Sequence, residues 1–388
     1  MIPIVYNLRS LKVRRTTTLA TALGVALVVF VLASAMMLSA GIKRTLGKSG
    51  RADTAIVMRK GADAELSSSI EEPSVALVLA APGVRRDERG VGIGVGELVV
   101  VITIDKLGTD GVSNVQVRGV AEGSTKMRPE LRVVAGRPAQ LGTDEVMVGQ
   151  RVAGRFKGLA LGQSFELRKG RPVKVVGVFS TEGSAFESEV WVDLNTLRSA
   201  FGREALVSSV RVRLEGASKY DGFAAVVEQD KNLMLMSQRE PEFYRKASES
   251  TADFASILGT VIAVFFSLGA MIGAMITMYA SIASREREIG TLRALGFSRG
   301  SVLLSFLLEA ILLSLLGGGL GLGASLLMSF VKISMMNFST WSEVVFSFTP
   351  TPEILGTALL FAGVMGLFGG LLPAVRAARL SPLKAMRG

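Results

Sequence analysis

Acidic, basic and hydroxyl side chains must carry any chemistry that this chain of 388 residues does, because the sequence contains neither histidine nor cysteine. Imidazole bases, thiolate nucleophiles and the usual nitrogen and sulfur ligands of zinc are therefore excluded. A serine–lysine pair or a pair of carboxylates could still form a catalytic site, but no spacing marks one. The sequence predicts no catalytic residue, no metal site and no cofactor-binding residue in this chain.

Two glycine-containing segments are similar to nucleotide-binding motifs but depart from them. Residues 41–49 read GIKRTLGKS, in which five residues separate the glycines where a phosphate-binding loop has four. Residues 90–96 place glycine at every second position, but Glu97 stands where the dinucleotide fingerprint needs a glycine. We expect a loop or hairpin at the second segment and no nucleotide at either.

The segment SREREIGTLRALG, residues 284–296, is the most informative part of the chain and lies between two long apolar runs. It predicts an amphipathic helix of about four turns that docks on the membrane or on a partner. The alternative is a solvated surface helix. Helical spacing places Ile289, Leu292 and Gly296 on an apolar face, flanked by Leu295, and places Glu286, Arg287 and Arg293 towards the other side.

Four apolar runs are long enough to cross a bilayer, which takes about 20 residues. They occupy residues 16–42, 254–283, 301–331 and 354–375. The first run is longer than the core of a secretory signal, so we expect it to remain as a transmembrane helix. In the third run, Glu309 could be a gating group, a hydrogen-bonding helix contact or a snorkelling residue. GGGLGLG, residues 317–323, favours close helix packing over a substrate path.

Basic residues set the expected orientation of these spans. They cluster in residues 9–15, 285–299 and 376–387, whereas the loop between the third and fourth runs has only Lys332. Because Lys and Arg are enriched in cytoplasmic segments, both termini and the 284–300 loop are predicted inside, and residues 43–253 outside. The net charge of +11 then favours contact with anionic membrane lipid and not with nucleic acid.

The outer segment alternates short apolar strands with short helices. This pattern predicts a mixed α/β domain inserted between the first and second spans. The length of the first run and the polar residues 242–253 also predict a stalk below that domain, with helix tilt as the alternative. Strands are predicted at residues 54–58, 98–104, 115–120, 146–148, 173–179, 190–192, 210–214 and 233–236, and helices at 73–80, 194–201 and 222–230.

Several segments resemble the MacB/FtsX/LolCE superfamily of ABC transporter permeases. Residues 286–321 are similar to the second cytoplasmic loop and third span of that family, and GLLPAVRAARLSPLKAMRG, residues 370–388, is similar to its C-terminal end. Short segments of the outer part of the chain are similar to the MacB-like periplasmic domain: APGV (81–84), VRGV (117–120), ALGQSFEL (160–167) and VKVVGVF (173–179). The resemblance covers nearly the whole chain.

The resemblance implies which residues would contact an ATPase and how the chain is divided. The coupling helix of the family would correspond to Arg285, Glu286, Glu288, Gly290, Leu292, Arg293, Ala294, Leu295 and Gly296, and its cytoplasmic tail would include Pro373, Arg376, Arg379 and Pro382. The implied order is cytoplasmic 1–15, first span and stalk 16–42, periplasmic core domain 43–253 (51–120 plus 206–237, with an inserted subdomain 121–205), second span 254–283, coupling helix 284–300, third span 301–331, periplasmic loop 332–353, fourth span 354–375 and cytoplasmic tail 376–388.

A function is implied in the same way. The chain would be the permease of an inner-membrane ABC transporter, working as a homodimer or with a paralogue above a dimer of cytoplasmic ATPase subunits that bind ATP and Mg. Because only 15 residues precede the first run, we expect the ATPase on a separate polypeptide, as in DevC-like split permeases. ATP-driven closure would move the periplasmic domain (mechanotransmission) and drive export through a periplasmic adaptor and an outer-membrane duct. The alternatives are FtsX-like regulation of a cell-wall hydrolase and LolCE-like lipoprotein release.

Overall fold

The computed structural model describes residues 15–230, 233–337 and 340–380. These residues form two compact units. The first, which we call the membrane unit, holds the described residues of Met1–Ala40, Asp253–Val331 and Ser347–Gly388. The second, which we call the α/β domain, holds the described residues of Gly41–Ala252 and Lys332–Phe346.

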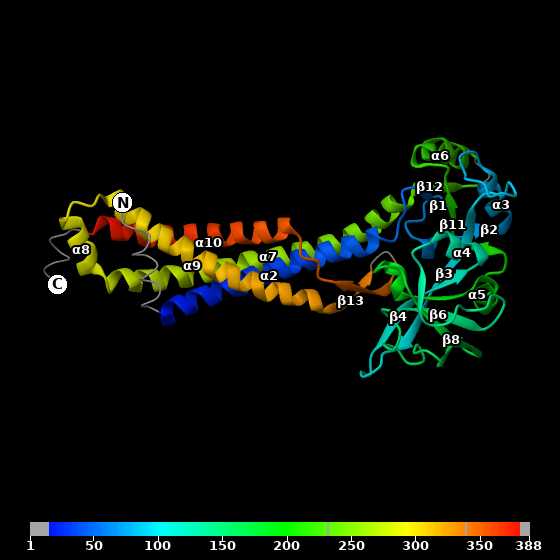
Figure 1. The fold of residues 1–388 in the computed structure, drawn as a ribbon, viewed down its shortest axis with the longest axis horizontal. Coiled ribbons are helices and arrows are strands. Elements are labelled where there is room, and N and C mark those ends of the chain that lie inside the picture. The colour runs from blue at the N-terminus through cyan, green and yellow to red at the C-terminus, as the bar shows by residue number, and fades with distance from the viewer. Residues whose placement is uncertain (1–14, 231–232, 338–339, 381–388) are drawn as a thin grey trace. The chain divides into compact units, whose positions relative to one another are not determined.

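Each of the four predicted spans lies in a long apolar helix, which confirms that prediction (Figure 1). α7 alone has 44 residues and measures about 66 Å, roughly twice the thickness of a bilayer core. The first residues of α7 and the last residues of α2 are part of the α/β domain. The helices are α2 (Arg15–Gly47), α7 (Glu240–Ala283), α9 (Arg299–Leu327) and α10 (Pro352–Arg379), and the 3-10 turn η4 (Met328–Phe330) follows α9.

The fourth helix extends beyond the apolar run 354–375 that predicted it. α10 continues through Arg376 to Arg379 and contains Pro373, so the first residues of the predicted tail are helical. The last turns stay helical because Ala374 and Ala377 are buried in an apolar cluster of the membrane unit. Pro382 of the predicted tail lies outside the described residues.

Glycines of α9 allow neighbouring helices to approach closely. A Cβ atom added at Gly317 would lie 2.5 Å from the carbonyl oxygen of Ala22 in α2, and one at Gly318 would lie 2.6 Å from the Cβ atom of Ala362 in α10. Gly321 approaches the backbone of α2 in the same way, at 2.3 Å. The glycine run therefore serves helix packing, the interpretation that the sequence favoured.

The α/β domain is built on one ten-stranded sheet with the order β12-β1-β11-β3-β4-β9-β6-β8-β5, and β7 pairs with β8. Strands from residues 54–120 and 209–239 are neighbours in this order, and strands from residues 132–193 continue the sheet through the parallel pair β4 and β9. The strands are β1 (Thr54–Arg59), β3 (Gly94–Asp105), β4 (Val112–Val120), β5 (Arg132–Gly136), β6 (Glu145–Gly149), β7 (Ser164–Arg168), β8 (Arg171–Ser180), β9 (Glu189–Asp193), β11 (Ser209–Arg213) and β12 (Leu235–Arg239).

Helices and short turns cover this sheet, and the apolar core lies between the two layers. Every strand and helix predicted for the outer segment is present, so the mixed α/β fold is confirmed, whereas β2, β5, β7, β10 and α4 were not predicted. The covering elements are α3 (Glu72–Ala80), α4 (Glu122–Met127), α5 (Leu194–Phe201), α6 (Tyr220–Gln229), the 3-10 turns η1 (Glu65–Ser67), η2 (Ala185–Ser188) and η3 (Ala217–Lys219), and the strand pair β2 (Ile70–Glu71) and β10 (Leu206–Val207).

Candidate coupling site

The predicted coupling helix is present but shorter than expected. α7 ends at Ala283, and α8 (Glu286–Ala294) has 9 residues, or about two and a half turns. The prediction of about four turns is wrong because Gly296, at φ +93°, takes the left-handed conformation that ends helices. Ser298 then caps the N-terminus of α9 by accepting a hydrogen bond from the backbone N–H of Ser301 at 3.2 Å.

The apolar side of α8 packs inside the membrane unit. Ile289 is 1% exposed and belongs to a cluster with residues of α7, α9 and α10, against which Leu292 also packs. Leu295 and Gly296, expected near the same apolar side, face outward instead, and Leu295 is 73% exposed. The apolar side of α8 is therefore buried at Ile289 and exposed at its end, at Leu295.

Arg285 and Glu309 are brought together although 23 residues separate them in the sequence. The Arg285 Nη1 lies 3.2 Å from Glu309 Oε2, and the Arg285 Nε lies 3.1 Å from Glu288 Oε2. The guanidinium also lies over the ring of Phe306. Both Arg285 and Glu309 are buried. Glu309 thus joins α9 to the segment between α7 and α8.

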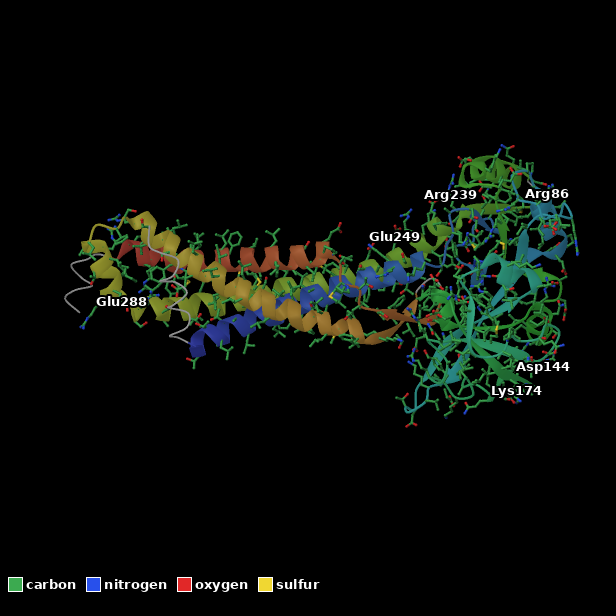
Figure 2. The ribbon with its side chains drawn as sticks, viewed as in Figure 1. Arg86, Asp144, Lys174, Arg239, Glu249 and Glu288 are labelled. Atoms are coloured by element: carbon green, nitrogen blue, oxygen red, sulfur yellow. The ribbon has the colours of Figure 1, made fainter. Side chains whose placement is uncertain are left out.

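The surface that α8 leaves for a partner is consequently smaller than the predicted set. Arg293 is half-buried, and its Nη1 donates to the carbonyl oxygen of Phe297 at 3.2 Å. Gly290 is buried as well. The exposed residues of the predicted coupling set are Glu286, Glu288 (labelled in Figure 2), Ala294, Leu295 and Gly296, together with Arg287.

The predicted tail residues lie near this helix. Pro373, Arg376 and Arg379 all belong to α10. The Arg376 guanidinium stands 5.4 Å from the ring centroid of Tyr279 in α7, and Leu380 packs against the cluster that contains Ile289. The end of α10 thus helps to fix the end of α7 and the position of α8.

A second charged cluster, which the sequence reasoning missed, lies in the α/β domain where α7 begins. We call it the anchor cluster. Arg118 in β4 pairs with Glu189 at 2.7 Å, with Glu65 at 2.9 Å and with Glu97 at 3.1 Å. All members of the cluster are buried: Arg118, Arg128, Arg211, Glu65, Glu97, Glu189 and Glu240.

The first turns of α7 are part of the anchor cluster. Arg211 in β11 pairs with Glu240, the first residue of α7, at 2.8 Å, and donates to the hydroxyl of Tyr244 at 3.2 Å. Tyr244 also packs edge to face against Phe186. The start of α7 is therefore held by ionic, hydrogen-bonding and aromatic contacts to the sheet.

Burial and ion pairing act in opposite directions on the acids of this cluster. Burial alone would raise the pKa of Glu97, but Arg128, Arg211 and Arg118 outweigh it and lower that pKa to about 2. The pKa of Glu65 is lowered for the same reason, by Arg118 and Arg211. For Glu240 burial prevails over the attraction of Arg211 and raises the pKa. The sequence does contain one indication of the anchor cluster, because Glu97, Arg118 and Arg211 are charged residues within otherwise apolar strands.

The segment between α9 and α10, predicted as a loop, forms a hairpin that belongs to the α/β domain. It consists of β13 (Lys332–Asn337) and β14 (Ser342–Ser347). Glu343 pairs with Lys106 and Arg155, each at 2.8 Å, and accepts a hydrogen bond from the Ser113 hydroxyl at 2.5 Å. Arg151 donates to the carbonyl oxygen of Val345. These contacts attach the hairpin to the sheet.

Comparisons with known proteins agree on two regions. Residues 16–230 match the family described as MacB-like periplasmic core domain, and residues 260–382 match the FtsX-like permease C-terminal family. The uncharacterized ABC transporter permease YknZ of Bacillus subtilis is 29% identical over 56% of this chain and 55% of its own length. The macrolide export ATP-binding/permease protein MacB of Escherichia coli K12 is 32% identical over 55% of this chain and 33% of its own length. The chain thus spans about half the length of YknZ and about a third of the length of MacB.

Two solved structures are also similar to the chain. The extracellular domain of the noncanonic ABC-type transporter YknZ from Gram-positive bacteria is 20% identical, with a TM-score of 0.36 over 48% of this chain and 99% of that chain. The periplasmic region of MacB from Actinobacillus actinomycetemcomitans is 12% identical, with a TM-score of 0.37 over 49% of this chain and 90% of that chain.

Proposed function

This chain belongs to the family of FtsX-like permeases that carry a MacB-like periplasmic core domain, and from this membership we propose that it couples ATP hydrolysis by a cytoplasmic ATPase partner to movement of its α/β domain. The observation that carries the proposal is the continuity of α7. This one helix begins at Glu240 in the anchor cluster and ends at Ala283, two residues before α8. A displacement of α8 by the ATPase would be transmitted along this one continuous helix.

The contacts at both ends of α7 suit it to this role. At one end, Arg285, between α7 and α8, is held by Glu309 and Glu288. At the other end, Glu240 and Tyr244 are held by Arg211. Buried charge pairs resist separation, because removal of one partner leaves the other without compensation. The exposed part of α8, with Leu295 at its end, is the surface that we assign to the ATPase.

We assign the outer surface of α7 to a second copy of this chain. In its most apolar 18-residue stretch only 11% of the residues are buried, against 44% or more for the other three spans. Gly269 and Gly273 follow the small-xxx-small spacing that favours helix contact in membranes, and they line a groove with α2. If the complex is a heterodimer, a paralogue of this chain would occupy the same surface of α7.

Export of a periplasmic or membrane-derived substrate is the activity that we favour, because one relative is named as a macrolide exporter. This sequence holds no valid phosphate-binding loop, so we expect ATP and Mg to bind to the ATPase partner. We place the complex in the bacterial inner membrane with both termini in the cytoplasm. A periplasmic adaptor and an outer-membrane duct would complete the export route.

The direct test of the coupling surface is Leu295→Asp. Leu295 is exposed on α8, so the substitution should leave the fold unchanged but place a charge in the proposed ATPase contact. We expect co-purification with the ATPase to weaken by about tenfold or more, as for a residue at the centre of an interface. Leu77→Asp is the matched control, because Leu77 is 57% exposed on α3 of the α/β domain. Equal ATPase binding by both variants would refute the assigned surface.

A further inference from the structure

The loop that joins β8 to β9 contacts the segments through which the α/β domain is connected to the membrane unit. We call this loop, residues 181–188, the strap, and its second half is η2. Within the α/β domain, the strap touches the end of α2, the start of α7 and β14. These segments lead to three of the four points at which the chain passes between the two units, which are residues 40–41, 252–253, 331–332 and 346–347.

Two hydrogen bonds join the strap to the residues that follow α2. The Lys48 Nζ donates to the carbonyl oxygen of Glu182 at 2.7 Å, and the backbone N–H of Ala185 donates to the Ser49 Oγ at 3.0 Å. Lys48 is exposed, so water competes for its hydrogen bond. Both bonds use the backbone of the strap, so a change in its backbone conformation would break them together.

The contacts of the strap with α7 and β14 are more deeply buried. Phe186 is 1% exposed and packs edge to face against Tyr244 of α7, and its ring centroid lies 4.4 Å from the guanidinium of Arg128. The Ser188 hydroxyl accepts a hydrogen bond from the backbone N–H of Val345 in β14 at 3.2 Å. Buried contacts of this kind cost more to break than a hydrogen bond to an exposed lysine. We therefore expect the contacts with α2 to open first.

The strap is held in shape by its own side chains but contains one strained residue. The Glu187 carboxylate accepts hydrogen bonds from the backbone N–H groups of Thr181 at 2.9 Å and Gly183 at 2.8 Å. It also pairs with Arg151 at 3.1 Å. Between them, Glu182 has a φ of +55°, in the left-handed region that is uncommon for residues other than glycine and asparagine. Release of the strap from α2 would relieve this strain.

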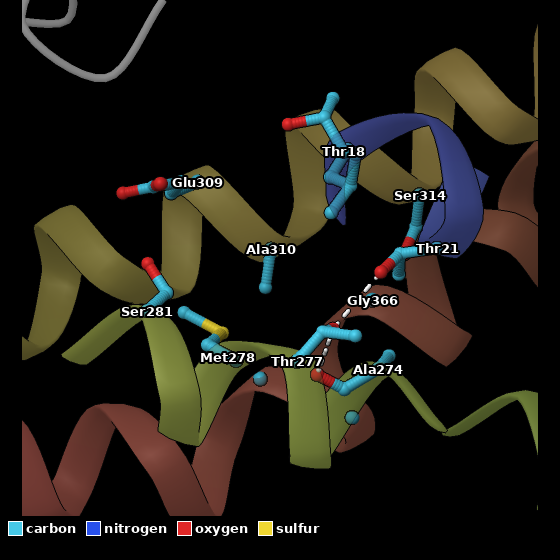
Figure 3. A pocket seen from close by; sticks show the side chains of 13 residues that line it. Thr18, Thr21, Ala274, Thr277, Met278, Ser281, Glu309, Ala310, Ser314 and Gly366 are labelled. Atoms are coloured by element: carbon cyan, nitrogen blue, oxygen red, sulfur yellow. Dashed lines mark hydrogen bonds between the residues drawn. The ribbon is translucent and has the colours of Figure 1, made fainter. Parts of the chain in front are cut away.

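A movement of α7 would reach the strap through α2, because the two helices are neighbours in the membrane unit. The hydroxyls of Thr21 in α2 and Thr277 in α7 are hydrogen-bonded at 2.9 Å (Figure 3). Gly259 of α7 lies so close to Ala35 of α2 that a Cβ atom there would clash. Helices packed through such small residues move together. A displaced α2 would then pull on the two hydrogen bonds at its end.

We propose that the strap is a releasable contact. It leaves the end of α2 while it stays attached to α7 and β14, and the end of α2 then moves relative to the sheet. Release is a local opening of the native domain, which costs less free energy than unfolding of the whole sheet. The coupling of this release to ATP hydrolysis rests on the proposed function, whereas the release itself does not.

A buried cysteine in the strap reports its release. Ser184 is fully buried and the chain has no cysteine of its own, so Ser184→Cys in the full chain in nanodiscs reacts with a thiol reagent only when the strap opens. Adding Ser49→Ala should raise the labelling rate about fivefold or more, since the hydrogen bond from Ala185 is lost. Lys48→Met, at an exposed position, should raise it too. Ser218→Ala, exposed on η3, is the matched control and should leave the rate unchanged.

Val148→Cys distinguishes release of the strap from unfolding of the domain. Val148 is fully buried in β6, so its thiol reacts only when the sheet opens. We expect Ser184→Cys to react about tenfold faster or more, and its rate to change little at low urea, because local opening exposes little surface. The rate of Val148→Cys should rise steeply with urea. Equal rates with equal urea dependence, or no acceleration of Ser184→Cys by Ser49→Ala and Lys48→Met, would overturn the release.

Two further measurements test the strain and the link to ATP. Glu182→Asn should slow the labelling of Ser184→Cys, because asparagine adopts the left-handed conformation more readily, and faster labelling would contradict the role of strain. With the ATPase, trapping with Mg–ATP should accelerate the labelling. An unchanged rate would overturn the link between the strap and ATP hydrolysis, whereas failure of the Leu295→Asp test would overturn the proposed function alone.

Discussion

The anchor cluster combines three arginines and four glutamates in the interior of the α/β domain. Burial of each charge opposes folding, and only the dense pairing around Arg118 and Arg211 makes the arrangement tolerable. Apolar residues of the same volume could fill this space at least as favourably. The ion pairs also attach α7 to the sheet, because Glu240 and Tyr244 of α7 both contact Arg211.

Loss of one acid from the anchor cluster should be strongly destabilising. Glu97 is fully buried and accepts two hydrogen bonds from Arg128, both at 2.7 Å. Glu97→Ala leaves that guanidinium buried without its closest partner, so we expect a loss of about 3–5 kcal/mol in the free energy of unfolding. Denaturant unfolding followed by the fluorescence of the buried Trp191 measures it. The exposed control Glu166→Gln on β7 should stay within about 0.5 kcal/mol, and a similar effect of both would contradict the prediction.

The hairpin contact should depend on pH through Glu343. Burial alone would raise the pKa of Glu343, but Lys106, Ser113, Ser334 and Arg155 together lower it from 4.5 to about 2. A lowered pKa stabilises the folded state above pH 4.5, and this stabilisation is lost as the pH falls towards 2.

The Glu343 contribution can be isolated with Glu343→Gln. Because Lys106 and Arg155 are about a third exposed, solvent screening reduces the expected contribution to about 1–2 kcal/mol. The stability difference between wild type and Glu343→Gln should be largest above pH 5 and should shrink between pH 4.5 and 2. A difference that does not change with pH would show that the carboxylate contributes packing and not charge.

At the scale of elements, close helix packing depends on single glycines. A Cβ atom at Gly321 would lie 2.3 Å from the carbonyl oxygen of Ala26, whereas one at Gly319 would meet nothing within 4 Å. Gly321→Ala should therefore destabilise the membrane unit by about 1–3 kcal/mol. Gly319→Ala should be neutral or slightly stabilising, because alanine favours the helix. Unfolding in mixed detergent micelles compares the two, and equal stabilities would contradict the observed packing.

The sequence was most informative where a pattern is local. Long apolar runs define the four spans, and strand periodicity gives the mixed α/β domain. The Arg285–Glu309 pair and the anchor cluster join residues from separate elements, for which a single sequence offers no pairing signal. Leu295 was assigned to the apolar side because it flanks Leu292 in helical spacing. Its exposure depends on the end of α8 before Gly296, which tertiary packing decides.

At the scale of the whole molecule, the orientation that we propose from the basic clusters can be tested with single cysteines. Thr109→Cys lies at the exposed turn between β3 and β4, and Ala294→Cys lies on the exposed side of α8. We expect an impermeant thiol reagent to label Thr109→Cys in cells with a permeabilised outer membrane, and to leave Ala294→Cys unlabelled until the inner membrane is disrupted. The opposite pattern would reverse the proposed topology.

Transmission along α7 is the central claim, and an ATP-dependent distance between two copies of the chain tests it most directly. A spin label at Glu249→Cys, where the native side chain is 44% exposed on α7 (Figure 2), reports the domain end of that helix. In nanodiscs with the ATPase, trapping with Mg–ATP should shift the label-to-label distance distribution, and Leu295→Asp should abolish that shift. An unchanged distribution in a complex that binds and hydrolyses ATP would contradict the account.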